Sequence, residues 1–280
     1  MIKIVSDTLS CITPSEAQQL NIALLPQFVI FNETETYRDD FEITYEQFLA
    51  KLKQSSALPK TSAPSPSLYN PVYSEALQTN DTILVIVPSE TLSGTYRGAS
   101  VGAQDFPEAD IRVFDTACIG PAQGSMTRCA LEWVSQGLPI DLIIENLTIM
   151  RDRQKSYFVV DTLEYLHKNG RIGTAKALLG SVLEIKPILR LNNGSIVPIE
   201  SQRTQKKAIA RLRELVYENY PKHSSGYLTI CHANAPELAK QLAEEFAKEL
   251  NLQQVPIFNL PPAIMVHTGP GTICAQFFTE

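Results

Sequence analysis

Two short segments place small hydroxyl residues beside turn-forming residues, a pattern suited to binding an anion. They are Lys60–Ser65 (KTSAPS) and Glu90–Tyr96 (ETLSGTY). Each is followed by a helical pattern, and a chain that enters a helix through Ser, Thr and Gly presents hydroxyls together with free backbone N–H groups. A third segment, Val266–Gly271 (VHTGPG), places a histidine between an apolar run and a glycine turn. We expect the three segments to converge on one small anionic group that is held without a metal.

The hydrophobic pattern of the first half of the chain predicts strands that alternate with helices. Thr82–Val87 is continuously apolar after its first residue and rich in β-branched residues, which is typical of a strand buried on both faces. Helical patterns cover Gly120–Gln136 and Pro139–Arg153, and Thr44–Gln47 has the capping-box form of a helix start. Strands alternating with helices indicate a mainly parallel sheet. We therefore expect residues 1–155 to form an N-terminal three-layer α/β domain.

The pattern changes near Ser156, where we place the start of a second domain. Two β-like runs flank the turn Asn192–Ser195, and Asn-Gly is a strong hairpin signal. A hairpin among helices predicts a mixed sheet, so we expect residues 156–280 to form a C-terminal two-layer α/β domain. The apolar run Ile264–His267 is expected to be one of its strands.

Composition and charge argue against several classes of protein. The 280 residues carry a formal net charge of −6, whereas general nucleic-acid binding demands surplus Lys and Arg. None of the five cysteines belongs to a C-x-x-C pair or has a histidine at ligand spacing. The sequence also contains no Walker A motif and no H-E-x-x-H, and we expect no metal and no cofactor. No apolar run approaches the ~20 residues of a membrane helix. The N-terminus lacks the apolar core of a signal peptide, so we expect a cytoplasmic protein.

Short motifs occur in a fixed order along the whole chain. They are Ser6–Thr8, Thr61–Ser65, Leu92–Tyr96, Asp115–Thr116, Asp161–Leu166 with Gly170–Ile172, Lys186–Leu189, Arg203–Ala208 and His267–Gly271. Together they resemble the DegV family of bacterial lipid-binding proteins, which includes the fatty-acid-binding subunits of a two-component fatty acid kinase. The chain departs mildly from the family pattern at Thr8, where Ser is frequent, and at Asn169, where Gly is frequent.

The resemblance implies two α/β domains with a long-chain fatty acid, such as palmitate, stearate or oleate, between them. The expected head-group site consists of positions in the family's motifs and their chain neighbours: Thr61, Ser62, Ser93, Gly94, His267 and Thr268. In the kinase system the binding subunit presents the acyl group to a separate kinase, which makes acyl-phosphate for phospholipid synthesis. The resemblance therefore implies a ligand-binding subunit without catalytic residues. Arg171 and Arg203 are its expected contacts to a partner or a phosphate, and peripheral membrane contact would serve acyl exchange.

The chemistry of a buried carboxylate fits the hydroxyl segments, although other readings stay open. A carboxylate offers only acceptors, so the hydroxyls of Thr61 and Ser93, nearby N–H groups and one imidazole could suffice to hold it. Alternatively, Thr61 and Ser93 only cap turns and helices, and His267 is a core residue with both nitrogens satisfied. A Ser93–His267 hydrolase is a third reading, but Thr91 stands where the first glycine of a G-x-S-x-G elbow would be. A carrier or sensor without a kinase partner is the fourth.

A basic segment and an apolar tunnel complete the expected site. The basic segment comprises five cations on one predicted helical stretch of an acidic protein: Arg203, Lys206, Lys207, Arg211 and Arg213. Such a run is either a solvated face, or here a docking surface for a kinase or a contact to nucleotide phosphate. The acyl chain needs a dry tunnel, since each buried CH₂ contributes ~0.8 kcal/mol. We expect its lining to come from Thr82–Val87, Gly120–Gln136 and Pro139–Arg153.

Overall fold

The computed structural model describes residues 1–39, 41–180, 185–222 and 225–279, which fall into two compact units. Unit 1 comprises Met1–Asp152 and Pro261–Ala263, and unit 2 comprises Arg153–Leu260 and Ile264–Glu280. Unit 1 holds a parallel sheet and unit 2 a mixed sheet, which confirms the predicted α/β fold class. The domain boundary placed after residue 155 stays a prediction.

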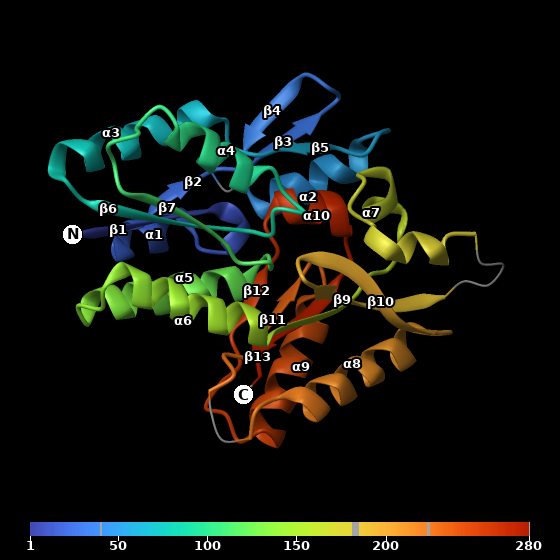
Figure 1. The fold of residues 1–280 in the computed structure, drawn as a ribbon. Coiled ribbons are helices and arrows are strands. Elements are labelled where there is room, and N and C mark those ends of the chain that lie inside the picture. Colours follow the sequence, from blue (N-terminus) through green and yellow to red (C-terminus); the bar gives the residue numbers. More distant parts are fainter. Residues whose placement is uncertain (40, 181–184, 223–224, 280) are drawn as a thin grey trace. The chain divides into compact units, whose positions relative to one another are not determined.

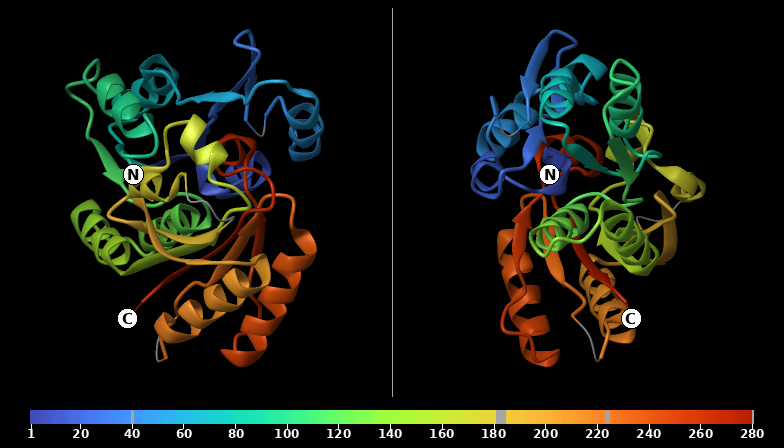
Figure 2. Two further views of the ribbon diagram at one scale, coloured as in Figure 1. Left: turned by 90° about the vertical axis from the view of Figure 1, so that its right-hand side faces the viewer. Right: turned by 60° about the vertical axis from the view of Figure 1, so that its left-hand side comes forward.

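Unit 1 is built on a parallel sheet with the strand order β2-β1-β6-β7. Its strands are β1 (Ile2–Asp7), β2 (Ala23–Leu25), β6 (Thr82–Val87) and β7 (Ile111–Asp115). Helices cover both faces of the sheet (Figures 1 and 2), which gives three layers. One face carries α3 (Asn70–Thr79) and α4 (Thr95–Ala103). The other carries α5 (Pro121–Ser135) and α6 (Ile140–Arg153), and α1 (Pro14–Leu20) follows the loop after β1.

The direction of the parallel strands explains why polar residues gather at one edge of the sheet. β1 ends at Asp7 and β6 ends at Val87, and parallel neighbours present their carboxyl ends together. From Ile83 to Val87 every residue of β6 is at most 1% exposed, as expected for a strand covered on both faces. The loop from Val87 to α4 therefore starts at this edge, and it contains Ser93.

A small antiparallel sheet with the order β4-β3-β5 also belongs to unit 1. Its strands are β3 (Phe28–Phe31), β4 (Glu35–Arg38) and β5 (Lys60–Ser62). Helix α2 (Tyr45–Gln54) packs against it through Phe48, whose ring centroid lies 5.8 Å from that of Phe31. The capping box at the start of α2 is confirmed, because Thr44 and Gln47 exchange both hydrogen bonds. The sequence pattern did not predict this sheet.

Unit 2 contains a mixed sheet with the order β10-β9-β8-β13-β11-β12. The strands are β8 (Gln154–Val159), β9 (Lys186–Asn192), β10 (Ser195–Gln202), β11 (Thr229–His232), β12 (Ile257–Asn259) and β13 (Ile273–Phe278). The pair β11 and β12 is parallel, and the other neighbours are antiparallel. Asn193 and Gly194 both have positive φ, which confirms the predicted hairpin turn.

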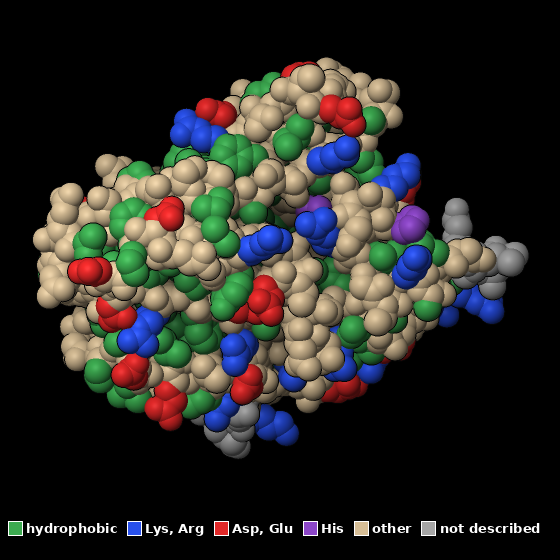
Figure 3. Space-filling view, turned by 45° about the horizontal axis from the view of Figure 1, so that its top comes forward, with side chains coloured by type: hydrophobic (Ala, Val, Ile, Leu, Met, Phe, Trp, Pro, Cys, Tyr) green, Lys and Arg blue, Asp and Glu red, His purple; other side chains and the backbone are tan. Residues whose placement is uncertain are grey.

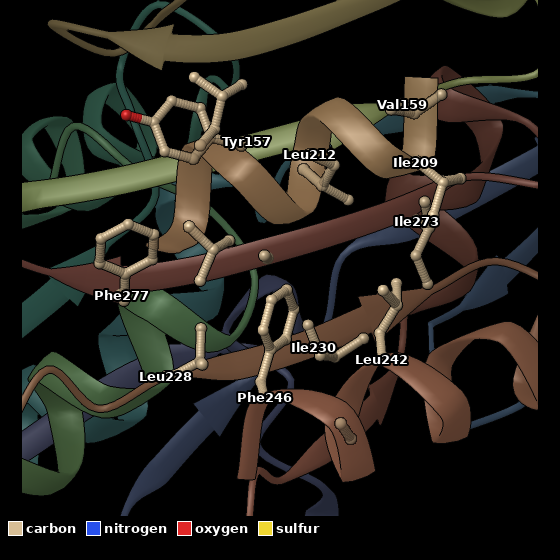
Figure 4. Packing of buried hydrophobic residues seen from close by; sticks show 14 of the residues in the cluster. Tyr157, Val159, Ile209, Leu212, Leu228, Ile230, Leu242, Phe246, Ile273 and Phe277 are labelled. Carbon is tan, nitrogen blue, oxygen red and sulfur yellow. The ribbon is translucent and has the colours of Figure 1, made fainter. Parts of the chain in front are cut away.

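Two amphipathic helices bury their apolar faces on this sheet. They are α8 (Gln205–Asn219) and α9 (Pro236–Glu249), and α7 (Glu164–Lys168) is a shorter helix of the same unit. Figure 4 shows Leu212 of α8 and Phe246 of α9 directed towards side chains of the strands, among them Ile230 and Ile273. Phe246 is fully buried and packs edge-on against Tyr217.

The predicted strand over Ile264–His267 is wrong, because these residues belong to helix α10 (Pro262–Thr268). Every residue from Leu260 to Val266 is buried, so the run carries no alternation of apolar and polar positions from which a period could be read. Pro262 occupies the first turn, where a missing N–H costs nothing. The Asp39 carboxylate accepts a hydrogen bond from the Ala263 N–H at 3.2 Å and so satisfies a helix-start donor. His267 consequently lies in the last turn of a helix.

Candidate functional site

Ser93 lies at the entrance of α4, one residue before the N-cap Gly94. Its backbone N–H donates to the Ser89 carbonyl at 3.0 Å. Its hydroxyl oxygen accepts a hydrogen bond from the Thr95 N–H at 3.3 Å and lies 2.8 Å from the Thr95 hydroxyl oxygen. Ser93 therefore does take part in the helix entry, as the capping alternative expected, but the residue is only half-buried and can also face a ligand.

Thr61 lies on the edge strand β5 opposite Val29, and not at a helix entry as we expected. It is half-buried, while its neighbours Lys60 and Ser62 are exposed. The Ser62 hydroxyl donates to the Ala63 carbonyl at 3.2 Å. Thr61 is thus not a helix cap, and Ser62 already uses its hydroxyl proton within the chain.

The chain that follows Thr61 packs directly on α4. A Cβ atom placed on Gly98 would lie 2.6 Å from the Pro64 carbonyl oxygen, and one placed on Gly102 would lie 2.8 Å from the Pro66 carbonyl oxygen. A Cβ atom on the exposed Gly94 would lie 3.6 Å from Ala63. At Gly98 and Gly102 only glycine permits so close an approach, whereas the distance at Gly94 is an ordinary van der Waals contact. The two hydroxyl segments, some thirty residues apart in sequence, are therefore neighbours in unit 1.

His267 is held in a largely desolvated position in unit 2. Burial, with a smaller contribution from the positive charge of Arg171, lowers the pKa of His267 from 6.5 to about 4. The imidazole is therefore neutral at pH 7, with one nitrogen as donor and the other as acceptor. Asn169 donates from its side-chain amide to the Val266 carbonyl at 2.9 Å, which ties the turn before Arg171 to α10.

The other predicted residues of unit 2 have different surroundings. The Thr268 hydroxyl donates to the Ile264 carbonyl at 3.3 Å, so its proton is already engaged in α10. Arg171 is half-buried and donates to the Asn169 carbonyl at 3.0 Å. Asn169 keeps a negative φ of −95°, while Gly170 takes a left-handed φ of +71° and ends the α7 turn. Arg203 is exposed, directly before the N-cap Thr204 of α8.

The basic segment divides into two kinds of residue. Arg211 forms ion pairs with Glu200, Glu214 and Glu218 at 2.6–2.9 Å, and Arg213 pairs with Glu245 at 2.8 Å. The exposed cations Arg203, Lys206 and Lys207 instead stand at the start of α8, where the helix dipole disfavours positive charge. On the face drawn in Figure 3, Lys/Arg and Asp/Glu side chains are interspersed.

Sequence reasoning missed a buried polar cluster beneath Ser93. Asp7, at the end of β1, is 1% exposed and accepts hydrogen bonds from the Leu9 N–H and from the amides of Gln27 and Gln123, at 2.9, 3.2 and 3.0 Å. Burial raises the pKa of Asp7 to about 6, although these three hydrogen bonds oppose the shift. A carboxylate at the carboxyl end of a buried parallel strand is a signal that could have marked Asp7. Gln27 and Gln123 gave no sequence signal.

The hydrogen-bonding groups of the predicted site residues suit an anion better than a cation. Among the residues that the structure describes, no group of three or more His, Cys, Asp or Glu side chains is placed to hold a metal ion. The described cysteines are all buried. In the same described part of the chain, no helix combines the length and the apolar character needed to cross a bilayer. Hydroxyls, amides and a neutral imidazole can donate to carboxylate oxygens.

The lowered pKa of His267 predicts an acid-dependent loss of stability. The unfolded imidazole gains its proton near pH 6.5 and the folded one only near pH 4, so its contribution to the free energy of unfolding falls as the pH drops through this range. Asp7 acts in the opposite sense, because its raised pKa favours the folded state as the pH falls below about 6. Urea unfolding of wild type and His267→Gln at each pH separates the two, since Asp7 is common to both proteins. Parallel pH profiles would contradict a neutral, buried imidazole.

Comparison with known proteins places the chain in a family. The model of the family described as "Uncharacterised protein, DegV family" matches residues 1–280. A DegV domain-containing protein of Halalkalibacterium halodurans is 33% identical over 280 residues, and the match covers 100% of this chain and 99% of the relative. A solved structure described as fatty acid binding of a DegV family protein from Thermus thermophilus has a TM-score of 0.89 and 30% identity, with 100% and 99% of the two chains covered. DegV of Bacillus subtilis, described as a fatty acid binding protein, has a TM-score of 0.85 and 32% identity, with 99% of both chains covered. The chain therefore belongs to the DegV family.

Proposed function

We propose that this protein binds a long-chain fatty acid, such as palmitate, stearate or oleate, without a covalent bond. The observation that carries the proposal is its similarity, over the full length, to the Thermus and Bacillus proteins that are described as binding fatty acids. The adjacency of the segments that carry Thr61 and Ser93 supports a head-group site in unit 1. The ligand's placement between two domains stays a prediction.

In this proposal the carboxylate is held by donors rather than by a buried cation. Thr61 and Ser93 of unit 1 each supply a hydroxyl. A ring N–H from the neutral His267 of unit 2 stays a prediction, like the placement of the ligand between two domains. Hydrogen bonds to a charged group contribute ~1.5–3 kcal/mol each. Ser62 and Thr268 contribute less, because their hydroxyls donate to backbone carbonyls, and Gly94 is proposed to contribute only as the N-cap of α4. Within unit 1 the described hydroxyl partner of Ser93 is Thr95 rather than a base, and this contact does not favour a hydrolase.

The acyl chain is proposed to enter an apolar tunnel, for which the lining residues stay a prediction. β6 is packed tightly in the core of unit 1, where Val85 and Val87 contact the cluster that contains Tyr69 and Tyr73. Helix α6 exposes Leu142 and Ile149. The cytoplasmic location and peripheral membrane contact also stay predictions.

Mass spectrometry tests the proposed function directly. We expect the protein purified from bacteria to carry one fatty acid, seen as added mass in native spectra and as a free acid after denaturing extraction. Protein stripped of lipid should rebind palmitate, whose long chain gains ~0.8 kcal/mol per buried CH₂. Recovery of protein without lipid that binds neither added palmitate nor added oleate would contradict the proposal.

We further propose that the protein presents the fatty acid to a separate kinase that makes acyl-phosphate for phospholipid synthesis. The three exposed cations at the start of α8 support this step. Positive charge is unfavourable near the N-terminus of a helix, so these residues do not serve to stabilise α8, and contact with a partner or a phosphate would explain them. A guanidinium donates in a planar fork that suits a phosphate or a partner carboxylate. Arg171, close enough to His267 to lower its pKa, is the proposed phosphate contact in unit 2. A carrier or sensor without a kinase is the competing proposal.

Arg203→Ala should reduce acyl-phosphate formation by roughly ten- to a hundredfold and leave fatty-acid binding unchanged. The guanidinium is exposed, and removing it leaves the hydroxyl site intact. The assay needs the cognate kinase, ATP and palmitate, with binding measured in parallel. Lys240→Ala, an exposed cation on α9, is the matched control. A parallel fall in binding would place Arg203 in the ligand pocket, and no fall in either would make the basic segment a solvated face.

A further inference from the structure

A continuous chain of hydrogen bonds links Ser93 to the buried carboxylate of Asp7. The Ser93 and Thr95 hydroxyl oxygens lie 2.8 Å apart, and the Gln27 amide nitrogen donates to the Thr95 hydroxyl oxygen at 3.0 Å. The same nitrogen donates to Asp7 Oδ1 at 3.2 Å. Thr95, Gln27 and Asp7 are at most 2% exposed, so solvent does not compete for these bonds. All four residues belong to unit 1.

The carboxylate at one end of this hydrogen-bond chain determines which group is the donor in each of its bonds. The described partners of Asp7 are three N–H groups, from Leu9, Gln27 and Gln123, which is the environment of an ionised acceptor. An ionised Asp7 obliges Gln27 to turn its NH₂ group, and not its carbonyl, towards Asp7. The second proton of that NH₂ group then points at Thr95, whose hydroxyl oxygen must accept it.

The number of available protons then determines which group donates in the hydrogen bond between Thr95 and Ser93. Thr95 has one hydroxyl proton, and with Gln27 donating to its oxygen, that proton is directed to the Ser93 oxygen at 2.8 Å. The Ser93 oxygen also accepts from the Thr95 N–H at 3.3 Å. Both lone pairs of Ser93 are then occupied, and its own proton remains for a ligand. Ser93 is thereby set as a donor, the group that an acceptor-only carboxylate requires.

We propose that Asp7, through Gln27 and Thr95, orients the Ser93 hydroxyl as an obligate donor and so makes the site selective for a carboxylate over a neutral head group. The inference rests on the proposed function, because it deepens the head-group site described there. Asp7, Gln27 and Thr95 are positioning residues that need not touch the ligand. Loss of the Asp7 charge allows the amide of Gln27 to turn, so that its carbonyl faces Thr95. Thr95 then donates to Gln27 and accepts the hydrogen bond of the Ser93 hydroxyl, which no longer donates to the ligand.

The test compares two C16 ligands, palmitate and hexadecanol, in displacement of a fluorescent fatty acid. An alcohol can donate its own proton to a Ser93 that no longer donates, whereas a carboxylate cannot. Asp7→Asn should therefore weaken palmitate binding about tenfold, as for loss of one hydrogen bond to a charged group, and hexadecanol binding much less. Thr95→Val vacates one lone pair of the Ser93 oxygen without offering a new acceptor for its proton, so it should strengthen hexadecanol binding more than palmitate binding and shift the affinity ratio in the same direction. Thr95→Ser, which keeps the hydroxyl, should preserve the wild-type ratio of the two affinities.

Thr116→Val is the matched control, because Thr116 is an equally buried threonine of unit 1. Its hydroxyl donates to the Val87 carbonyl at 2.8 Å and takes no part in the hydrogen-bond chain from Ser93 to Asp7. It should keep the affinity ratio whatever it does to stability, which circular dichroism monitors. If Asp7→Asn fails to fold, Thr95→Val carries the test alone. An equal loss of both ligands, or an unchanged ratio in the folded variants, overturns the inference and leaves the proposed function standing. Wild-type protein that binds neither ligand overturns the proposed function itself.

Discussion

Thr61→Ala and Ser93→Ala are each expected to weaken palmitate binding by roughly 5- to 150-fold, which corresponds to ~1–3 kcal/mol, while the protein stays folded. Each substitution removes one hydroxyl donor from a carboxylate that the site otherwise desolvates. The two residues come from different elements, the edge strand β5 and the entrance of α4, so neither change breaks the element that carries the other. Titration of a fluorescent fatty acid measures the loss.

The matched control for these variants is Ser135→Ala. The Ser135 hydroxyl donates to the Glu132 carbonyl at 2.7 Å near the exposed end of α5. Its removal tests whether loss of any hydroxyl in unit 1 affects binding, and we expect no change. Circular dichroism of all three variants checks the fold. Unchanged affinity in both Thr61→Ala and Ser93→Ala would mean that these residues only shape the strand and the helix entry.

Phe246→Ala should lower the free energy of unfolding of unit 2 by ~3–5 kcal/mol, as for other large-to-small changes of a buried aromatic residue. Phe246 is fully buried at the centre of the cluster that joins α8, α9 and the sheet (Figure 4). Its ring also packs edge-on against Tyr217 at a centroid distance of 5.4 Å. Truncation leaves a cavity between two helices and a sheet that cannot easily collapse.

Urea unfolding followed by far-ultraviolet circular dichroism measures this effect. Ile257→Ala is the control, because Ile257 is an apolar residue of the same unit that is 41% exposed. The only tryptophan, Trp133, lies on α5 of unit 1, so its fluorescence reports separately on that unit. A loss below about 1 kcal/mol, close to that of a single buried CH₂, would contradict the packing described for Phe246.

The sequence predicted elements whose signal is local and missed those that depend on distant partners. The fully apolar β6, the capping box at Thr44 and the Asn193-Gly194 hairpin were readable, because each signal lies within a few residues. α10 was not, since a helix buried on all sides shows no period and resembles a buried strand. β5 spans only Lys60–Ser62, and its strand character comes from pairing with Val29 and its neighbours.

The candidate site shows the same division. The motifs identified Thr61 and Ser93, because hydroxyl residues beside turn-forming residues can be recognised in the sequence alone. The ring environment that lowers the pKa of His267 could not be read from its neighbours in sequence, since it comes from burial and from Arg171. Gln27 and Gln123 were invisible for a related reason: an isolated glutamine has no pattern, and both matter only because the fold brings them to Asp7.

The close contact between α4 and the chain after Thr61 separates the parts of this protein that can be redesigned from those that cannot. Side chains at positions 61 and 93 are only half-buried, so exchanging them leaves the packing between the two segments in place. A single methyl group at Gly98 or Gly102 would instead collide with the carbonyls of Pro64 or Pro66 and push the two segments apart. A library that aims at a new head group should therefore vary the hydroxyl positions and keep both glycines, since these glycines determine the distance across which any replacement pair must reach.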